Sequence, residues 1–164
     1  MKMKKEGTPK IYSYIVTNDM GFAPNPYHGY CTLACCKPDL RRTAKKGDWI
    51  IGLSGKKKGF ELIYIMTITK EPIRFVDYYH DYKRKRPSSQ FAIGDNIYKP
   101  IKNNPQYVSD YKQLQSEHSK GKDENMDTKI HDLGNKLQND RVLISDDFIY
   151  YGIIKEYLRS SILL

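Results

Sequence analysis

The chain has 164 residues, of which 39% are hydrophobic and 29% charged, a balance typical of one folded domain and unlike that of a disordered protein. Its longest apolar stretches, WIIGL and ELIYIMTI, are too short to cross a bilayer. The basic N-terminus MKMKKEGTPK lacks the apolar region that a secretion signal requires. We therefore expect a cytoplasmic protein without a membrane partner. Residues 1–164 are predicted to form a single domain that starts with a flexible tail at 1–10.

The first predicted elements are strands. Residues 11–17 (IYSYIVT) are β-branched and aromatic, which favours a strand. Residues 21–49 are irregular and rich in Pro, Gly and Cys, with a short helix predicted to begin at Pro38. A strand within 47–55, the loop GKKKG and a long strand at 60–69 then predict a hairpin, so the sheet is at least partly antiparallel.

The second half alternates helix, strand and polar sequence. Residues 73–86 place Phe75, Tyr79 and Tyr82 at helical spacing, and residues 91–101 predict a turn that leads into a short strand. The overall class is α+β, mainly β, and we expect a small, partly closed β-barrel with flanking helices.

The C-terminal third contains a polar excursion at residues 102–140, with one short helix predicted near 127–138. This excursion is a possible contact surface for a protein partner. Residues 141–153 hold two apolar runs around Asp146 and Asp147, and a final helix or strand is predicted at 155–164.

The charge is unevenly distributed. Of the net +9, residues 1–58 contribute +8 (12 basic against 4 acidic), 59–120 contribute +3, and 121–164 contribute −2. Such a basic field attracts polyanions, which favours a nucleic acid or a nucleotide as the partner. The alternative is a charge that only keeps the protein soluble.

Metal and thiol chemistry are weaker hypotheses. His28, Cys31, Cys35 and Cys36 are ligand types for zinc, but no second ligand pair follows, so we expect no metal and no cofactor. Cys31 and His28 could instead form a nucleophilic pair. Packed cysteines under a loop are the simpler interpretation.

Aromatic and polar side chains near the irregular loop predict a base-binding pocket, because bases stack on aromatic faces and are read by polar groups. The aromatic candidates include Phe22 and Trp49, and polar groups close by in sequence are Asn18, Asp19, Asn25, Thr32 and Ser54. The lysines of GKKKG, Lys56, Lys57 and Lys58, form a basic hairpin tip that could touch phosphates or be an ordinary exposed turn.

The segment YIVTNDMGFAPNPYHGYCTLACCKPDLRRTAKKGDWIIG, with the later GDNIYKP and VLISDDFIYYG, resembles the second family of nucleotide-modification-associated domains, small bacterial and phage domains that accompany modified-nucleotide systems. The order strand, loop, GDWIIG and hairpin is also similar to the PUA-like superfold, which includes EVE, ASCH and YTH domains. That likeness implies a base pocket between the end of the first strand, the loop (with Cys31) and Trp49, with a basic rim that also contains Lys37, Arg41 and Arg42.

Three functions follow as hypotheses. The first is a module that binds a modified or flipped base, with DNA favoured, in a nucleotide-modification or phage-defence system. The second is an enzyme acting on a nucleotide or base, with Asp19 or Asp48 as general base or Cys31 as nucleophile, although no catalytic set is defined. The third is an accessory interaction subunit that contacts its partner through residues 102–140.

Overall fold

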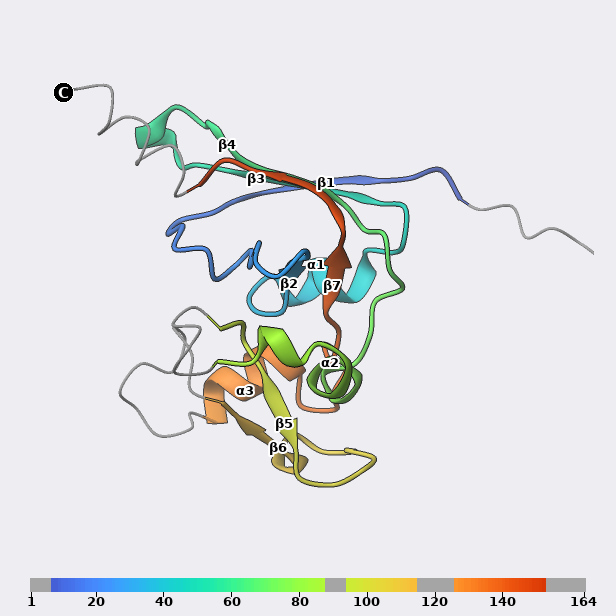
Figure 1. The fold of residues 1–164 in the computed structure, drawn as a ribbon. Helices are drawn as coiled ribbons and strands as arrows, with labels where there is room; N and C mark the ends of the chain where they lie inside the picture. The colour runs from blue at the N-terminus through green and yellow to red at the C-terminus, as the bar shows by residue number, and fades with distance from the viewer. Residues whose placement is uncertain (1–6, 88–93, 115–125, 153–164) are drawn as a thin grey trace, which may run out of the picture.

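The computed structural model describes residues 7–87, 94–114 and 126–152 (Figure 1). Within these ranges the chain is mixed α and β with mainly β-strands, which confirms the predicted class. The strands are β1 (Ile11–Ile15), β2 (Cys31–Leu33), β3 (Trp49–Leu53), β4 (Leu62–Thr67), β5 (Tyr98–Pro100), β6 (Tyr111–Gln113), β7 (Leu143–Ser145) and β8 (Asp147–Tyr150). The helices are α1 (Pro38–Thr43), α2 (Phe75–Asp81) and α3 (Met126–Leu133), with 3₁₀ turns η1 (Lys56–Lys58), η2 (Lys83–Lys85) and η3 (Val108–Asp110).

The main sheet has the strand order β1-β3-β4-β8. Strand β1 runs parallel to β3, with Tyr14 opposite Gly52, whereas β3, β4 and β8 pair antiparallel. The predicted hairpin is therefore confirmed as β3, η1 and β4. Its two strands are shorter than predicted at both ends. Beyond the strands, the N–H of Gly47 still donates to the carbonyl of Ile68 and the N–H of Ile68 to the carbonyl of Asp48, both at 2.8 Å.

The two faces of the main sheet differ. Ile50, Tyr64 and Met66 are fully buried on the inner face. Side chains alternate along a strand, so Trp49, directly before Ile50, lies on the outer face and is 39% exposed.

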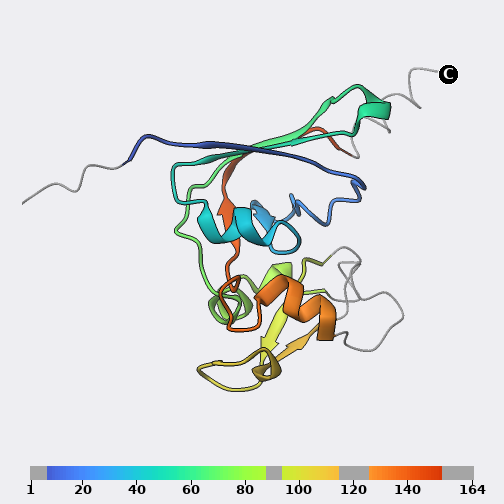
Figure 2. The ribbon, with the colours of Figure 1, turned by 180° about the vertical axis from the view of Figure 1, so that it is seen from behind.

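A second layer lies beneath the main sheet and consists of β2, β7 and α1 (Figures 1 and 2). Helix α1 begins at Pro38, as predicted. Strand β2 lies inside the segment that we expected to be irregular, and it pairs antiparallel with β7, placing Thr32 opposite Ile144. All three residues of β2 are buried, so the polar alternation that reveals longer strands is missing there.

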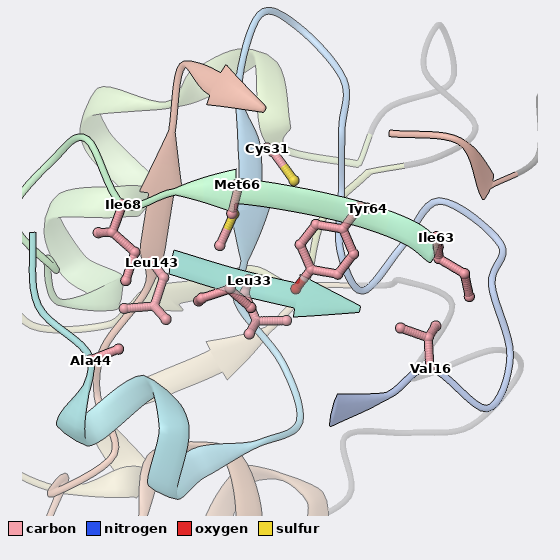
Figure 3. Packing of buried hydrophobic residues seen from close by; sticks show 10 residues of the cluster. Val16, Cys31, Leu33, Ala44, Ile63, Tyr64, Met66, Ile68 and Leu143 are labelled. Atoms are coloured by element: carbon pink, nitrogen blue, oxygen red, sulfur yellow. The ribbon is translucent and has the colours of Figure 1, made fainter. Parts of the chain in front are cut away.

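The first hydrophobic core fills the space between these layers (Figure 3). Leu33 of β2, Met66 of β4 and Leu143 of β7 come together there, and Ala44 follows α1 into the same cluster. This packing fixes the position of the Cys-rich segment under the sheet.

A second core lies further from the sheet, around α2, β5, β6 and α3 (Figures 1 and 2). Phe75, Tyr98 and Tyr111 are fully buried in it. The predicted helix at 73–86 is confirmed as the shorter α2, followed by η2, and the short helix expected near 127–138 is confirmed as α3.

The strands in the described ranges form one four-stranded and two two-stranded sheets, and no closed barrel is found among them. The outer strands of the main sheet, β1 and β8, pair with neither of the smaller sheets, so the PUA-like part of the prediction is not confirmed. The start of the tail expected at 1–10 and the element expected at 155–164 lie outside the described residues. No described helix has the length and apolarity that crossing a membrane requires.

Candidate functional site

A pocket of about 700 Å³ lies between β1 and α1. Small-molecule sites usually have volumes of about 300–1,000 Å³, so this pocket has room for a nucleotide. Four segments contribute to its wall: β1, the turn before α1, α1 itself and α3. The lining residues are Tyr12, Ser13, Tyr14, Cys36, Lys37, Pro38, Asp39, Leu40, Thr43 and His131.

Two tyrosines, a histidine and a lysine supply the pocket's aromatic and basic groups. Tyr14 is held by Tyr64, whose hydroxyl donates a hydrogen bond of 2.9 Å to the hydroxyl of Tyr14. Burial raises the pKa of Tyr14 well above its usual value, so the phenol stays neutral. The Nζ atom of Lys37 lies 5.0 Å from the centre of the Tyr14 ring, a cation–π distance.

The turn before α1 has an unusual backbone conformation, which hydrogen bonds with Asp132 and Arg41 stabilise. Cys36 and Lys37 both adopt left-handed conformations, with φ of 55° and 45°. The backbone N–H of Cys36 donates to Oδ1 of Asp132 at 3.2 Å, and Nε of Arg41 donates to the carbonyl of Cys36 at 2.9 Å. These bonds fix the turn that presents Lys37 to the pocket.

Arg41 and Arg42, both predicted phosphate contacts, have different surroundings. Arg41 is fully buried, and its guanidinium also donates to the carbonyls of Asp132, Asn139 and Arg141 at 2.6–3.0 Å. Arg42 is partly exposed and pairs with Asp39 of the pocket wall at 2.6 Å. The structure therefore brings Lys37 into the pocket wall, pairs Arg42 with the lining residue Asp39 and places Arg41 inside the molecule.

Thr32, a predicted base contact, lies in the interior beside a buried carboxylate. Its hydroxyl donates to Oδ2 of Asp95 at 2.5 Å, and the hydroxyl of Tyr78 donates to the same oxygen at 2.6 Å. Burial raises the pKa of Asp95, while these donors and the nearby Lys85 oppose that shift.

Asn25, also a predicted base contact, is bound to a lysine that sequence analysis missed. The buried ammonium of Lys85 donates to the backbone and side-chain oxygens of Asn25, at 2.9 and 2.8 Å, and to the carbonyl of Tyr30 at 2.7 Å. Burial lowers the pKa of Lys85 to about 8. No sequence signal separates it from its exposed neighbours Lys83 and Arg84, because all three stand in one basic run.

The cysteines lie at the inner side of the loop. Cys31 is fully buried, and burial raises the pKa of its thiol to about 12. The thiol therefore stays protonated at neutral pH, which argues against the nucleophile considered above. The sulfurs of Cys35 and Cys36 are 3.5 Å apart. In the described part of the chain, no group of three or more His, Cys, Asp or Glu residues is arranged to hold a metal ion.

The candidates that follow β1 lie at a different place. Asn18 is exposed, and its amide contacts the sulfur of Met20 at 3.3 Å. The hydroxyl of Tyr150 donates to Oδ1 of Asp19 at 2.6 Å, which ties the start of the loop to β8. Phe22 is buried at 7% exposure.

Trp49 and the hairpin candidates are also separate from the pocket. Trp49 lies on the outer face of the main sheet, whereas Tyr12 and Tyr14 line the pocket together with α1, which lies beneath that sheet. Ser54 is buried at the base of the hairpin, and Lys56–Lys58 are exposed at its tip. The structure does not bring these residues together with Cys31 and Thr32.

Comparison with known proteins identifies the family. No curated protein and no solved structure matches the chain. The model of the family described as "Nucleotide modification associated domain 2" matches residues 8–163, which is nearly the whole chain. This is the family that the sequence motifs indicate. The chain therefore belongs to the nucleotide modification associated domain 2 family.

Proposed function

We propose that this protein binds a nucleotide, or a modified base flipped out of DNA, in the pocket between β1 and α1, as part of a nucleotide-modification system. The observation that carries this proposal is the pocket itself. A volume of about 700 Å³ is lined by two tyrosines, a lysine and a histidine in a chain whose family is associated with nucleotide modification.

The lining residues suit the parts of a nucleotide. The rings of Tyr12 and Tyr14 offer aromatic faces for a base. Lys37, with Arg42 beyond Asp39, offers positive charge for a phosphate. The hydroxyl of Thr43 donates to the carbonyl of Asp39 at 2.8 Å, so its oxygen can accept a hydrogen bond at the edge of the ligand.

The net charge of +9 supports the same partner, because a basic protein captures polyanions faster and holds their backbones without reading the sequence. Six lining residues, from Cys36 to Thr43, belong to the loop region for which sequence analysis predicted a nucleotide pocket.

Isothermal titration calorimetry with single deoxynucleotides, plain and base-modified, tests the proposal. The wild-type protein should bind at least one of them saturably at one site. Lys37→Gln should weaken that binding about tenfold, because it removes one charged hydrogen-bonding group. Lys45→Gln removes the same charge from an exposed position outside the pocket and should change the affinity less than twofold.

Recovery of the ligand after titration separates a reader from an enzyme. An unchanged nucleotide supports binding alone, whereas a converted one indicates catalysis at the pocket. Equal losses of affinity in Lys37→Gln and Lys45→Gln, or no binding by the wild type, would contradict the proposal. The second result would favour an interaction subunit.

A further inference from the structure

The tip of the β3–β4 hairpin, Gly55–Phe60, projects beyond the rest of the main sheet (Figures 1 and 2). Its turn η1 consists of three consecutive lysines, Lys56–Lys58, all of them exposed. Phe60 directly follows this turn and is 52% exposed. The tip therefore presents one exposed aromatic ring beside three cations.

The backbone of the tip is fixed in place. The N–H of Ser54 donates to the carbonyl of Glu61 at 2.8 Å, and the N–H of Glu61 donates back to Oγ of Ser54 at 2.8 Å. Within the turn, the N–H of Gly59 donates to the carbonyl of Lys56 at 3.0 Å. These bonds hold the tip in one shape, so its lysines and its ring form a preorganised surface.

Phe60 also has an unfavourable backbone conformation, with φ of 56°. Bulky residues rarely adopt left-handed backbone, where glycine is preferred. Half-exposed as it is, Phe60 gains little packing that offsets this strain. Strained residues cluster at ligand-binding positions, which suggests that the ring serves a partner.

We propose that this tip contacts double-stranded DNA, with Lys56 and Lys57 on backbone phosphates and the ring of Phe60 wedged against a base step. Exposed lysines without a groove around them suit phosphates. A single apolar ring at a narrow tip suits insertion into a stacked duplex, whereas single-strand binding usually uses several aromatic rings along a groove.

The tip and the pocket lie close enough for one duplex to reach both. Tyr14 of the pocket wall lies opposite Gly52 in the sheet, and Lys56 follows Gly52 by four residues. At about 3.3 Å per extended residue, the tip begins at most about 13 Å beyond Tyr14, the length of about four base steps. The inference rests on the proposed function, because a wedge that opens the stack assists a base to leave it.

Fluorescence polarisation with a labelled duplex tests the lysines. Lys56→Gln/Lys57→Gln should weaken binding by at least fivefold and reduce the slope of log affinity against log salt by about 2. Lys99→Gln/Lys112→Gln is the matched control, since it removes the same charge from exposed, paired positions on β5 and β6. Its affinity should change less than twofold. Equal effects of the two double variants would overturn the assignment.

A duplex that contains 2-aminopurine tests the ring. Wild-type binding should raise the 2-aminopurine emission, because the base becomes unstacked. Phe60→Ala should abolish that rise and weaken binding about fivefold to tenfold without changing the salt slope, and Phe60→Trp should retain both. Ile101→Ala removes another exposed apolar side chain and should leave both readouts unchanged. An unchanged emission rise in Phe60→Ala would overturn the wedge.

Two further arms separate this inference from the proposed function and from a membrane contact. The tip variants should bind single nucleotides like the wild type. If the pocket binds no nucleotide, the calorimetry shows it, whereas the difference in duplex affinity between wild type and tip variants tests only the tip. Tip-dependent binding to vesicles of phosphatidylserine and phosphatidylcholine, without tip-dependent binding to duplex DNA, would assign the tip to a lipid surface and overturn the inference.

Discussion

Single buried charges hold the irregular loop in place. Lys85, the last residue of η2, reaches across to Asn25 and Tyr30 and satisfies three oxygen atoms with one ammonium group. The side-chain nitrogen of Asn25, by contrast, has no hydrogen-bond partner in the described part of the chain. The loop is therefore fastened to η2 by this lysine.

Replacing Lys85 should make the protein less stable. We expect Lys85→Met to lower the free energy of unfolding by about 2–4 kcal/mol, because three buried oxygens lose their donor. Urea denaturation measures this change. Lys83→Met is the matched control, since Lys83 is exposed in the same basic run, and it should cost less than about 0.5 kcal/mol. Similar values for the two variants would contradict the role of Lys85.

The same lysine should make stability depend on pH. The pKa of Lys85 is about 8 in the folded protein, below its usual value of 10.5. Between these values the unfolded chain binds more protons, so the free energy of unfolding rises with pH. The difference in the free energy of unfolding between the wild type and Lys85→Met should therefore increase by about 3 kcal/mol from pH 7.5 to 10.5. Paired urea titrations check this, and a difference that stays constant or falls would refute it.

At the scale of elements, Arg41 fastens α1 to the segment that leads from α3 to β7. Its guanidinium donates to four backbone carbonyls, those of Cys36, Asp132, Asn139 and Arg141. The planar group has five N–H donors, enough for all four carbonyls, whereas a lysine ammonium has three. The turn that carries Lys37 into the pocket is thus positioned by an arginine that never reaches the surface.

Exchange of that arginine for lysine separates a structural role from a ligand contact. Arg41→Lys should lower the free energy of unfolding by about 2–4 kcal/mol, because some of the buried carbonyls lose their donors. Arg42→Lys changes a partly exposed surface pair and should cost less than about 1 kcal/mol. Chemical denaturation of the two variants measures both values. If Arg41→Lys were as stable as Arg42→Lys, the fastening role would be wrong.

At the scale of the whole molecule, the main sheet separates two surfaces. The pocket lies on its inner side, and Trp49 lies on its outer side with Ile11 and Ile149, which are 69% and 52% exposed. The basic hairpin tip extends from one end of the same sheet. Distant parts of the chain thus form the pocket, whose wall combines β1, α1 and α3.

Trp49 should therefore contribute little to the pocket. We expect Trp49→Phe to change nucleotide affinity less than twofold, because the main sheet separates this ring from the ligand. Tyr12→Ala, which removes an aromatic ring from the pocket wall, should weaken binding about fivefold or more. Calorimetry on the two variants compares them. A larger loss for Trp49→Phe would place the base on the outer face instead.

Sequence patterns alone determined the class, the family, the β3–β4 hairpin, α1, α2 and α3, because apolar periodicity, turn residues and proline act over short distances. The nucleotide pocket at the loop, with Lys37 at its rim, stays a prediction; the structure places Lys37 in the wall of the pocket between β1 and α1. Only the tertiary structure decided which polar residues are buried. Arg41, Thr32 and Lys85 look like surface residues in the sequence, and their partners lie 55 to 100 residues away. Burial depends on such long-range contacts, and local composition carries no record of them.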